Sequence, residues 1–166
     1  EIAALLGITH PADVVLDEAN SSVFLTRQGM EIDLGAIAKG YIADRVRDYL
    51  HKEGVELGLI NLGGNVQTLG SPEGGWRVGL KKPFAGDALI GAMTVENRSV
   101  VTSGTYERYF EQNGKRYHHI LDPRTGYPLD NELDSVTIIS QDSLDGDIWT
   151  TLMYGKIGRA SCRERV

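Results

Sequence analysis

Residues 32–44 read IDLGAIAKGYIAD, which places a carboxylate and several small residues at the start of the clearest amphipathic helix in the chain. The spacing predicts a helix over residues 35–52, because its apolar side chains recur every four positions. They are Ala38, Ile42, Val46 and Leu50, with Tyr41 and Tyr49 widening the stripe. Asp33 stands where an N-cap residue would, and Gly54 stands where a C′ glycine would.

The same stretch is a candidate phosphate site, because unpaired N–H groups and the helix dipole attract anions to a helix N-terminus. The small residues Gly35 and Ala36 would let a ligand approach the backbone. A purely structural alternative also explains the stretch, since Asp is a common N-cap and Gly-Ala suits close packing. On these residues alone the structural alternative is favoured.

Short β-forming runs surround this helix, and Gly, Pro, Asn and Asp punctuate them as strand and turn patterns require. The runs lie at residues 14–16, 23–26, 58–61, 66–69, 76–80, 100–102, 117–121 and 135–140. A second helix is expected to begin near Asp145 to Asp147 and to run through Met153. The pattern predicts one α+β domain over residues 1–156, with mixed or antiparallel sheets and flanking helices, incomplete at both ends.

The last ten residues, 157–166 (IGRASCRERV), share none of the helical periodicity before them. They match the translation of a common short-read sequencing adapter, so we expect a non-native tail. The alternative is a natural basic tail. Cys162, the only cysteine, lies in this segment, and the remainder fits a disulfide-free protein.

Composition narrows the class of protein. The chain is 41% hydrophobic and 24% charged, which is ordinary for a globular domain. Its net charge of −6 argues against a nucleic-acid partner, because phosphate binding requires a basic face. No apolar run approaches the roughly 18 residues of a membrane span.

Two further motifs suggest ligand contact. Residues 61–65 (NLGGN) lie between two predicted strands, and the pair Gly63 and Gly64 would allow positive φ angles and a close ligand. The alternative is a tight turn or bulge. Residues 102–106 (TSGTY) follow another predicted strand.

Residues 117–128 (YHHILDPRTGYP) carry a pair of histidines followed by turn residues. In a strand, His118 and His119 would point to opposite faces, so one of them at most enters a given site. A histidine near a metal and a phosphate can act as a general base for a hydroxyl nucleophile. Arg124 could bind a phosphate or a structural carboxylate.

The segment 145–151 (DGDIWTT) is a candidate metal site. On a helix, Asp147 and Thr151 lie four residues apart and share one face. A carboxylate and a hydroxyl suit a hard cation such as Mg²⁺, which keeps room for waters or substrate phosphates. The alternative is an N-cap Asp and a packed Thr. The acidic spacing does not match an EF-hand loop.

Taken together and in this order, these segments resemble the ApbE family of FAD:protein FMN transferases. The resemblance covers residues 14–155 and rests on four motifs: DLGAIAKG at 33–40, NLGGN at 61–65, TSGTY at 102–106 and HHILDPRTGYP at 118–128. It implies an ApbE-like, T-fold-related domain. It also implies an enzyme that binds FAD and Mg²⁺, transfers FMN to a threonine hydroxyl of a target flavoprotein and releases AMP.

The resemblance also implies roles for single residues. The metal ligands would be the Ala36 carbonyl, Asp147 and Thr151, and the histidine acting as base would be His119. FAD would contact Asp33, Lys39, Gly63, Gly64, Thr102, Ser103, Gly104 and His119. The segment around Asp147 departs from the family pattern, because the bulky Trp149 stands where small residues are usual.

Two alternatives to transfer stay open: a Mg²⁺-dependent FAD pyrophosphatase that yields FMN and AMP, and a non-catalytic FAD-binding protein. The expected partners are FAD and an acceptor flavoprotein such as a respiratory flavin-bearing subunit, with no nucleic acid. The resemblance further implies a periplasmic or extracytoplasmic protein that touches the membrane only through an N-terminal lipid anchor absent from this sequence.

Overall fold

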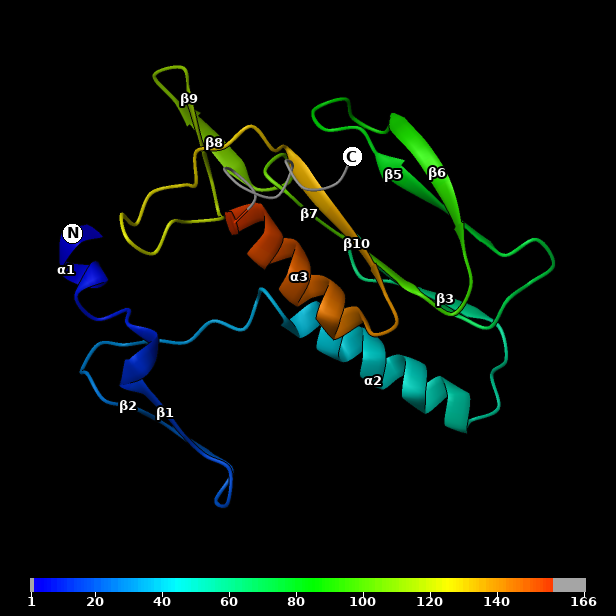
Figure 1. Ribbon diagram of the computed structural model, residues 1–166, viewed down its shortest axis with the longest axis horizontal. Helices are drawn as coiled ribbons and strands as arrows, with labels where there is room; N and C mark the ends of the chain where they lie inside the picture. The colour runs from blue at the N-terminus through cyan, green and yellow to red at the C-terminus, as the bar shows by residue number, and fades with distance from the viewer. Residues whose placement is uncertain (1, 157–166) are drawn as a thin grey trace.

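A four-stranded antiparallel sheet forms the centre of the computed structural model, which describes residues 2–156. Its strand order is β10-β7-β4-β3. The strands are β3 (Gly58–Asn61), β4 (Asn65–Leu69), β7 (Ser99–Gly104) and β10 (Ser135–Ser140). Each pairing is antiparallel, with Ser135 opposite Gly104 and Asn61 opposite Val66 (Figure 1). The predicted α+β class with antiparallel sheets is confirmed.

Two helices cover one face of this sheet. Helix α2 (Ala38–Lys52) packs on β4, and α3 (Ser143–Lys156) packs on β7, β10 and α2. The hairpin of β5 (Trp76–Lys81) and β6 (Leu89–Val95) packs against part of the opposite face. Strand alternation separates the faces, because Val101 lies against α3 whereas Val100 joins Val78 and Val95 in a cluster under the hairpin.

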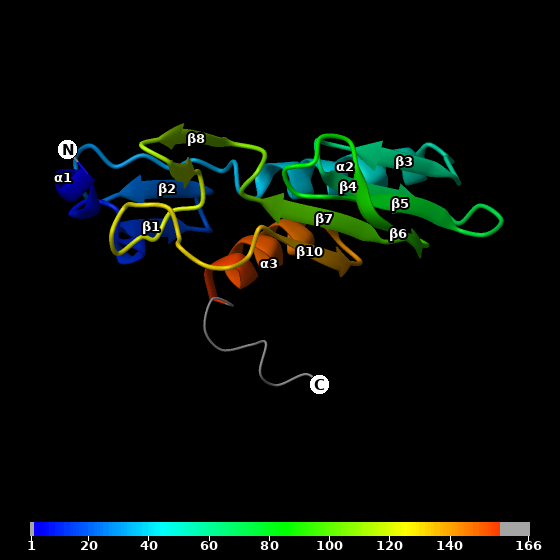
Figure 2. The same cartoon turned by 90° about the horizontal axis from the view of Figure 1, so that it is seen from above.

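The remaining elements lie toward one end of the molecule (Figure 2). They are helix α1 (Ile2–Leu6), the 3₁₀ turn η1 (Pro11–Asp13), the hairpin β1 (Val14–Asp17) to β2 (Ser22–Leu25), and the hairpin β8 (Tyr109–Gln112) to β9 (Lys115–His118). Strands β6 and β8 were not predicted; Gly91 interrupts the first run, and every residue of the second is exposed, so it has no alternation of buried and exposed side chains. The predicted strand over 117–121 is displaced: β9 ends at His118, and Leu121 forms an isolated bridge with Pro128.

The end of α2 agrees with the prediction and its start does not. Gly54 has a φ of +81° and closes the helix with bonds from its own N–H to the His51 carbonyl and from Val55 N–H to the Leu50 carbonyl. The helix begins at Ala38 rather than at residue 35, and its N-cap position, Ile37, has no side-chain cap. Asp33 is therefore not the N-cap; its Oδ1 accepts from the Gly35 N–H at 2.6 Å.

The buried face of α2 also differs from the apolar stripe. Tyr41 and Ile42 are 55% and 49% exposed, whereas the buried residues are Gly40, Ala43 and Asp44. The reason is the contact with α3: a Cβ at Gly40 would lie 2.5 Å from the Ser143 carbonyl oxygen, so only glycine permits this approach. Helix α3 itself begins at Ser143, slightly before the predicted start.

Among the described residues, no helix is both long enough and apolar enough to cross a membrane. The segment 157–166, interpreted as a non-native tail, lies outside the described residues.

Candidate functional site

Asp147 links three elements at the end of the central sheet. Its Oδ2 accepts from the Gly40 N–H of α2 at 2.6 Å, and its Oδ1 accepts from the Asn65 amide of β4 at 3.1 Å. The side chain is only 4% exposed. Each carboxylate oxygen therefore has one donor and keeps acceptor capacity for a further partner.

The bond from Gly40 changes the first turn of α2. In a regular helix the Gly40 N–H would donate to the Ala36 carbonyl, four residues earlier. Here it donates to Asp147, and Leu34 O accepts from both Ile37 N–H and Ala38 N–H. Within residues 2–156, nothing donates a hydrogen bond to the Ala36 carbonyl. The contact that joins Asp147 to α2 thus leaves the carbonyl oxygen of Ala36, just before this helix, without a hydrogen-bond donor among the described residues.

The oxygen donors predicted for the metal site are of the kind that Mg²⁺ binds. The described part of the chain holds no group of three or more His, Cys, Asp or Glu side chains that could bind a metal. Asp147, the Ala36 carbonyl and the Thr151 hydroxyl would supply one carboxylate and two neutral oxygens. Magnesium is commonly bound by one or two carboxylates while substrate phosphates and water complete its octahedron.

Buried polar contacts hold Asp147 in this position. Asp44 of α2 accepts from the first N–H groups of α3, Ser143 N at 2.8 Å and Leu144 N at 2.9 Å, and so caps that helix across the interface. Arg47 pairs with Asp44 at 3.2 Å. The Ser143 hydroxyl also donates to Asn65 Oδ1. Sequence analysis missed Asp44 and Ser143, because the cap and the capped helix lie about a hundred residues apart.

The Gly63 and Gly64 turn lies next to this junction. Their φ angles are +59° and +90°, so the expected positive φ is confirmed. Lys39 Nζ donates to the Gly63 carbonyl at 3.3 Å, and Thr102 N–H donates to the Gly64 carbonyl at 3.2 Å. Residues from three predicted motifs therefore meet at one turn.

The residues of the TSGTY motif face different partners. Thr102 Oγ1 is 2.9 Å from Thr137 Oγ1, and the Ser103 hydroxyl donates to Thr150 Oγ1 at 2.8 Å on α3. Gly104 has a packing role, because a Cβ there would lie 2.4 Å from the Tyr106 ring. Thr102, the first residue of the motif, also lines a cavity.

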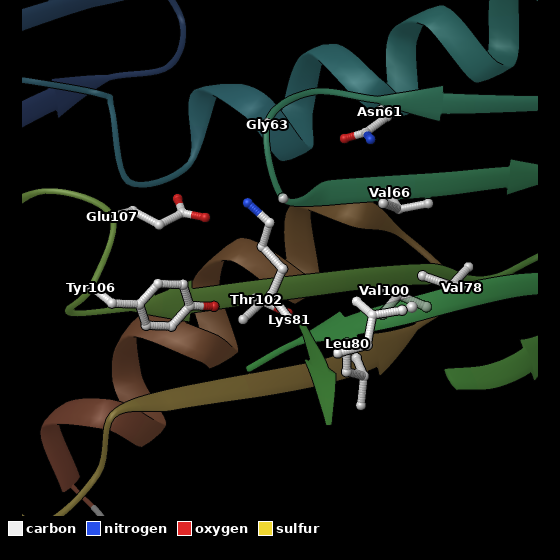
Figure 3. Close-up of a pocket in the computed structure, with 13 residues that line it drawn as sticks. Asn61, Gly63, Val66, Val78, Leu80, Lys81, Val100, Thr102, Tyr106 and Glu107 are labelled. Atoms are coloured by element: carbon white, nitrogen blue, oxygen red, sulfur yellow. The ribbon is translucent and has the colours of Figure 1, made fainter. Parts of the chain in front are cut away.

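That cavity, of about 550 Å³, lies between the central sheet and the β5–β6 hairpin (Figure 3). Its walls combine the Gly63–Gly64 turn and Thr102 with apolar side chains such as Val66, Val78 and Val100. Its charged and polar lining also includes Asn61 and Tyr106 of the predicted motifs, and Lys81 and Glu107, which were not predicted from the sequence. Lys81 could not be found from sequence, because it reaches the cavity only through the fold of the hairpin.

The two histidines have distinct environments. His118 is half-buried: its Nδ1 accepts from the Ile120 N–H at 3.3 Å, and its Nε2 lies 3.0 Å from the Leu129 carbonyl. A carbonyl can only accept, so Nε2 carries the proton and the ring is neutral. Burial lowers the pKa of His118 below its usual value, which agrees with this tautomer.

His119 is exposed and lies just after β9 ends, not within a strand as predicted. Its Nδ1 is 3.3 Å from the Arg108 carbonyl, so Nδ1 carries the proton in the neutral ring and Nε2 keeps a free lone pair. No hydrogen bond connects His119 or Asp33 to the Asp147 junction within the described chain. Arg124 is already engaged with Asp122 at 2.7 Å, and this pairing holds the pKa of Asp122 at about 2.

Comparison with known proteins identifies the family. The model of the ApbE family matches residues 1–160. Among curated proteins, the chain is 68% identical to an FAD:protein FMN transferase of Klebsiella pneumoniae, over 99% of this chain and 52% of that protein. It is 41% identical to the enzyme of the same name from Treponema pallidum, over 82% of this chain and 41% of that protein. The chain thus spans about half the length of the curated relatives it matches.

Solved structures of ApbE proteins have the same fold as this chain. The ApbE protein of Thermotoga maritima superposes with a TM-score of 0.86 at 40% identity, over 96% of this chain and 52% of that one. The flavinyl transferase ApbE of Pseudomonas stutzeri, in its apo form, gives a TM-score of 0.76 at 30% identity, over 92% and 47%. With a family match over nearly its whole length and the same fold in these relatives, the chain belongs to the ApbE family.

Proposed function

We propose that the full-length protein transfers the FMN moiety of FAD to a threonine hydroxyl of an acceptor protein, in a Mg²⁺-dependent reaction that releases AMP. The observation that carries this proposal is the junction at Asp147. There a buried carboxylate, a carbonyl without a partner and the Gly63–Gly64 turn with its lysine come together. The relatives named FAD:protein FMN transferase support the same reaction class.

In the proposed reaction the threonine oxygen attacks the phosphorus of the FMN phosphoryl group. A P–O bond to threonine forms, the bond from that phosphorus to the bridging oxygen breaks, and AMP leaves with the electron pair. The hydroxyl proton passes to His119 Nε2, whose lone pair is free because Nδ1–H is held by the Arg108 carbonyl. Lys39 and Asp33 would contact FAD near the start of α2.

Asp147, Thr151 and the Ala36 carbonyl would hold the Mg²⁺ ion. The ion would neutralise pyrophosphate charge and polarise the attacked phosphorus. The buried bonds from Gly40 and Asn65 would keep the Asp147 carboxylate in one orientation as substrate binds. Positioning and electrostatics of this kind supply most of the catalysis of phosphoryl transfer.

The second candidate is hydrolysis of FAD to FMN and AMP, which would use the same residues with water as the acceptor. A third is FAD binding without chemistry. To separate them, the full-length protein would be incubated with FAD, Mg²⁺ and an acceptor bearing the target threonine. Fluorescent FMN bound covalently to the acceptor supports transfer, and free FMN with AMP supports hydrolysis. Bound FAD with no AMP supports the third candidate and contradicts the proposal.

For the acceptor we propose a flavoprotein such as a respiratory flavin-bearing subunit, and for the site of action the periplasm or another extracytoplasmic location with a lipid anchor. Both rest on the family resemblance. An acceptor threonine changed to valine should lose the covalent flavin. An export signal in the full-length gene would support the location, and its absence would contradict it.

A further inference from the structure

The β5–β6 hairpin forms a wall of the cavity without joining the central sheet. It makes its own two-stranded sheet, and it rests on the sheet through Val78, Val95 and Val100. Its connecting loop is held at the other end by Phe84, over whose ring the Arg116 guanidinium lies at 3.9 Å. Phe84 has a φ of +56°, an uncommon conformation for a bulky residue that these contacts stabilise. The hairpin is thus fixed at both ends above the cavity.

Lys81, the last residue of β5, brings a cation from this hairpin into the cavity. In Figure 3 its amino end points toward the part of the cavity that Glu107 and Gly63 line. Neither side chain forms an ion pair with any residue in the part of the chain that the structure describes. A cation and an anion that face one open cavity without pairing suit a ligand with both an anionic group and hydrogen-bond donors.

Most of the apolar and the charged side chains line different parts of the cavity (Figure 3). Apolar side chains of the sheet and the hairpin, Val66, Val100 and Leu80, form one part. Lys81, Glu107 and the Gly63–Gly64 turn form the polar part, where Lys39 also donates to Gly63. A nucleotide has the same division, because a flat base suits an apolar wall and the ribose and phosphate are polar. The paired hydroxyls of a ribose ring match the two oxygens of one carboxylate.

We propose that Lys81 binds the phosphate of the AMP half of FAD, while Glu107 accepts hydrogen bonds from the ribose hydroxyls. This assignment rests on the proposed function, because it takes FAD as the ligand of the cavity. Lys81 is then a substrate-binding residue supplied by the hairpin and not by any of the four motifs. Because AMP is the leaving group, the same ammonium stabilises the charge that develops on its phosphate as the P–O bond breaks.

The experiment measures binding of AMP, adenosine and FMN to the full-length protein by titration calorimetry, without turnover. Lys81→Gln should weaken AMP binding by roughly 10- to 100-fold, as loss of a charged hydrogen bond implies. Adenosine binding should change less than about twofold, because adenosine carries no phosphate. Lys81→Arg should restore much of the AMP affinity. The matched control is Lys82→Gln, which removes the same charge from the next residue outside the cavity and should leave AMP binding unchanged.

Three results would overturn the assignment. Equal weakening of AMP and adenosine would mean that Lys81 does not act on the phosphate. Weakening of FMN in place of AMP would put the other half of FAD in the cavity. Unchanged AMP binding in Lys81→Gln would remove Lys81 from the site, even if the wild-type enzyme still cleaves FAD. A wild-type protein that neither binds nor cleaves FAD would instead contradict the proposed function itself.

Discussion

Replacing Gly40 by alanine tests whether the close approach of α2 and α3 assembles the site. The added Cβ would lie 2.5 Å from the Ser143 carbonyl oxygen and 2.7 Å from Leu144 Cα. Both are backbone atoms, so no side-chain rotation relieves the clash and the helices must separate. Separation lengthens the 2.6 Å bond from the Gly40 N–H to Asp147, on which the geometry of the proposed metal ligands depends.

The expected cost follows from three contributions to the free energy of unfolding. Overpacking costs about 1–3 kcal/mol, and weakening a buried hydrogen bond to a charged group costs about 1–3 kcal/mol more. The higher helix propensity of alanine stabilises the protein by about 1 kcal/mol and offsets part of this cost. We therefore expect Gly40→Ala to destabilise the full-length protein by about 3 kcal/mol and to raise the Mg²⁺ concentration needed for AMP release.

Urea unfolding followed by tryptophan fluorescence measures the stability change, and AMP release against Mg²⁺ concentration measures the effect on the site. Gly155→Ala is the matched control, because among the described residues a Cβ there meets only Leu129 Cδ1 at 3.7 Å, an ordinary contact. It should stabilise the protein slightly or leave it unchanged. A Gly40→Ala protein as stable as wild type, with an unchanged Mg²⁺ requirement, would show that the close approach of α2 and α3 does not assemble the site.

Three further predictions concern the residues around the site. His119→Ala in the full-length enzyme should lower turnover, measured as AMP release, by roughly 10²-fold or more with little change in FAD affinity, as loss of a general base implies. His118→Ala should lower turnover much less, and a larger loss in His118→Ala than in His119→Ala would make His118 the base. Burial lowers the pKa of His118 in the folded protein below its value of about 6.5 in the unfolded chain. The stability that neutral His118 contributes is therefore complete above the unfolded pKa and is lost as pH falls toward the folded pKa. Between pH 7.5 and pH 5.5 the urea midpoint should fall by less in His118→Gln than in wild type. Asp44→Ala removes the cap of α3 and should cost about 2 kcal/mol by urea unfolding, whereas an unchanged midpoint would show that the cap is dispensable.

The sequence patterns predicted the helices and strands whose formation depends on neighbouring residues in the chain. The four-residue repeat identified α2, and Gly54 marked its end because a positive φ after a helix is set by the neighbouring backbone. The strands of the central sheet were predicted for the same reason. The start of α2 was misplaced, since the Gly40 N–H bonds to Asp147, which lies 107 residues away in sequence.

The site was predicted as separate motifs but not as an arrangement. The motif residues Lys39, Gly63 and Thr102 do meet at one turn. Asp44 and Lys81 carry no sequence signal, because an aspartate within a helix and a lysine at a strand end are common on protein surfaces. Their positions depend on helix packing and on the fold of the β5–β6 hairpin, which sequence periodicity does not describe.

The most direct test of Asp147 as a Mg²⁺ ligand is AMP release from FAD by the full-length protein as Mg²⁺ is varied, in wild type and in Asp147→Ala. Asp145→Ala is the control, since it removes an exposed carboxylate from the same helix and leaves the Asp147 junction intact. We expect Mg²⁺-dependent AMP release in wild type and in Asp145→Ala, and none in Asp147→Ala at any Mg²⁺ concentration that supports the wild type. Normal AMP release by Asp147→Ala at low Mg²⁺ would show that Asp147 does not bind the ion.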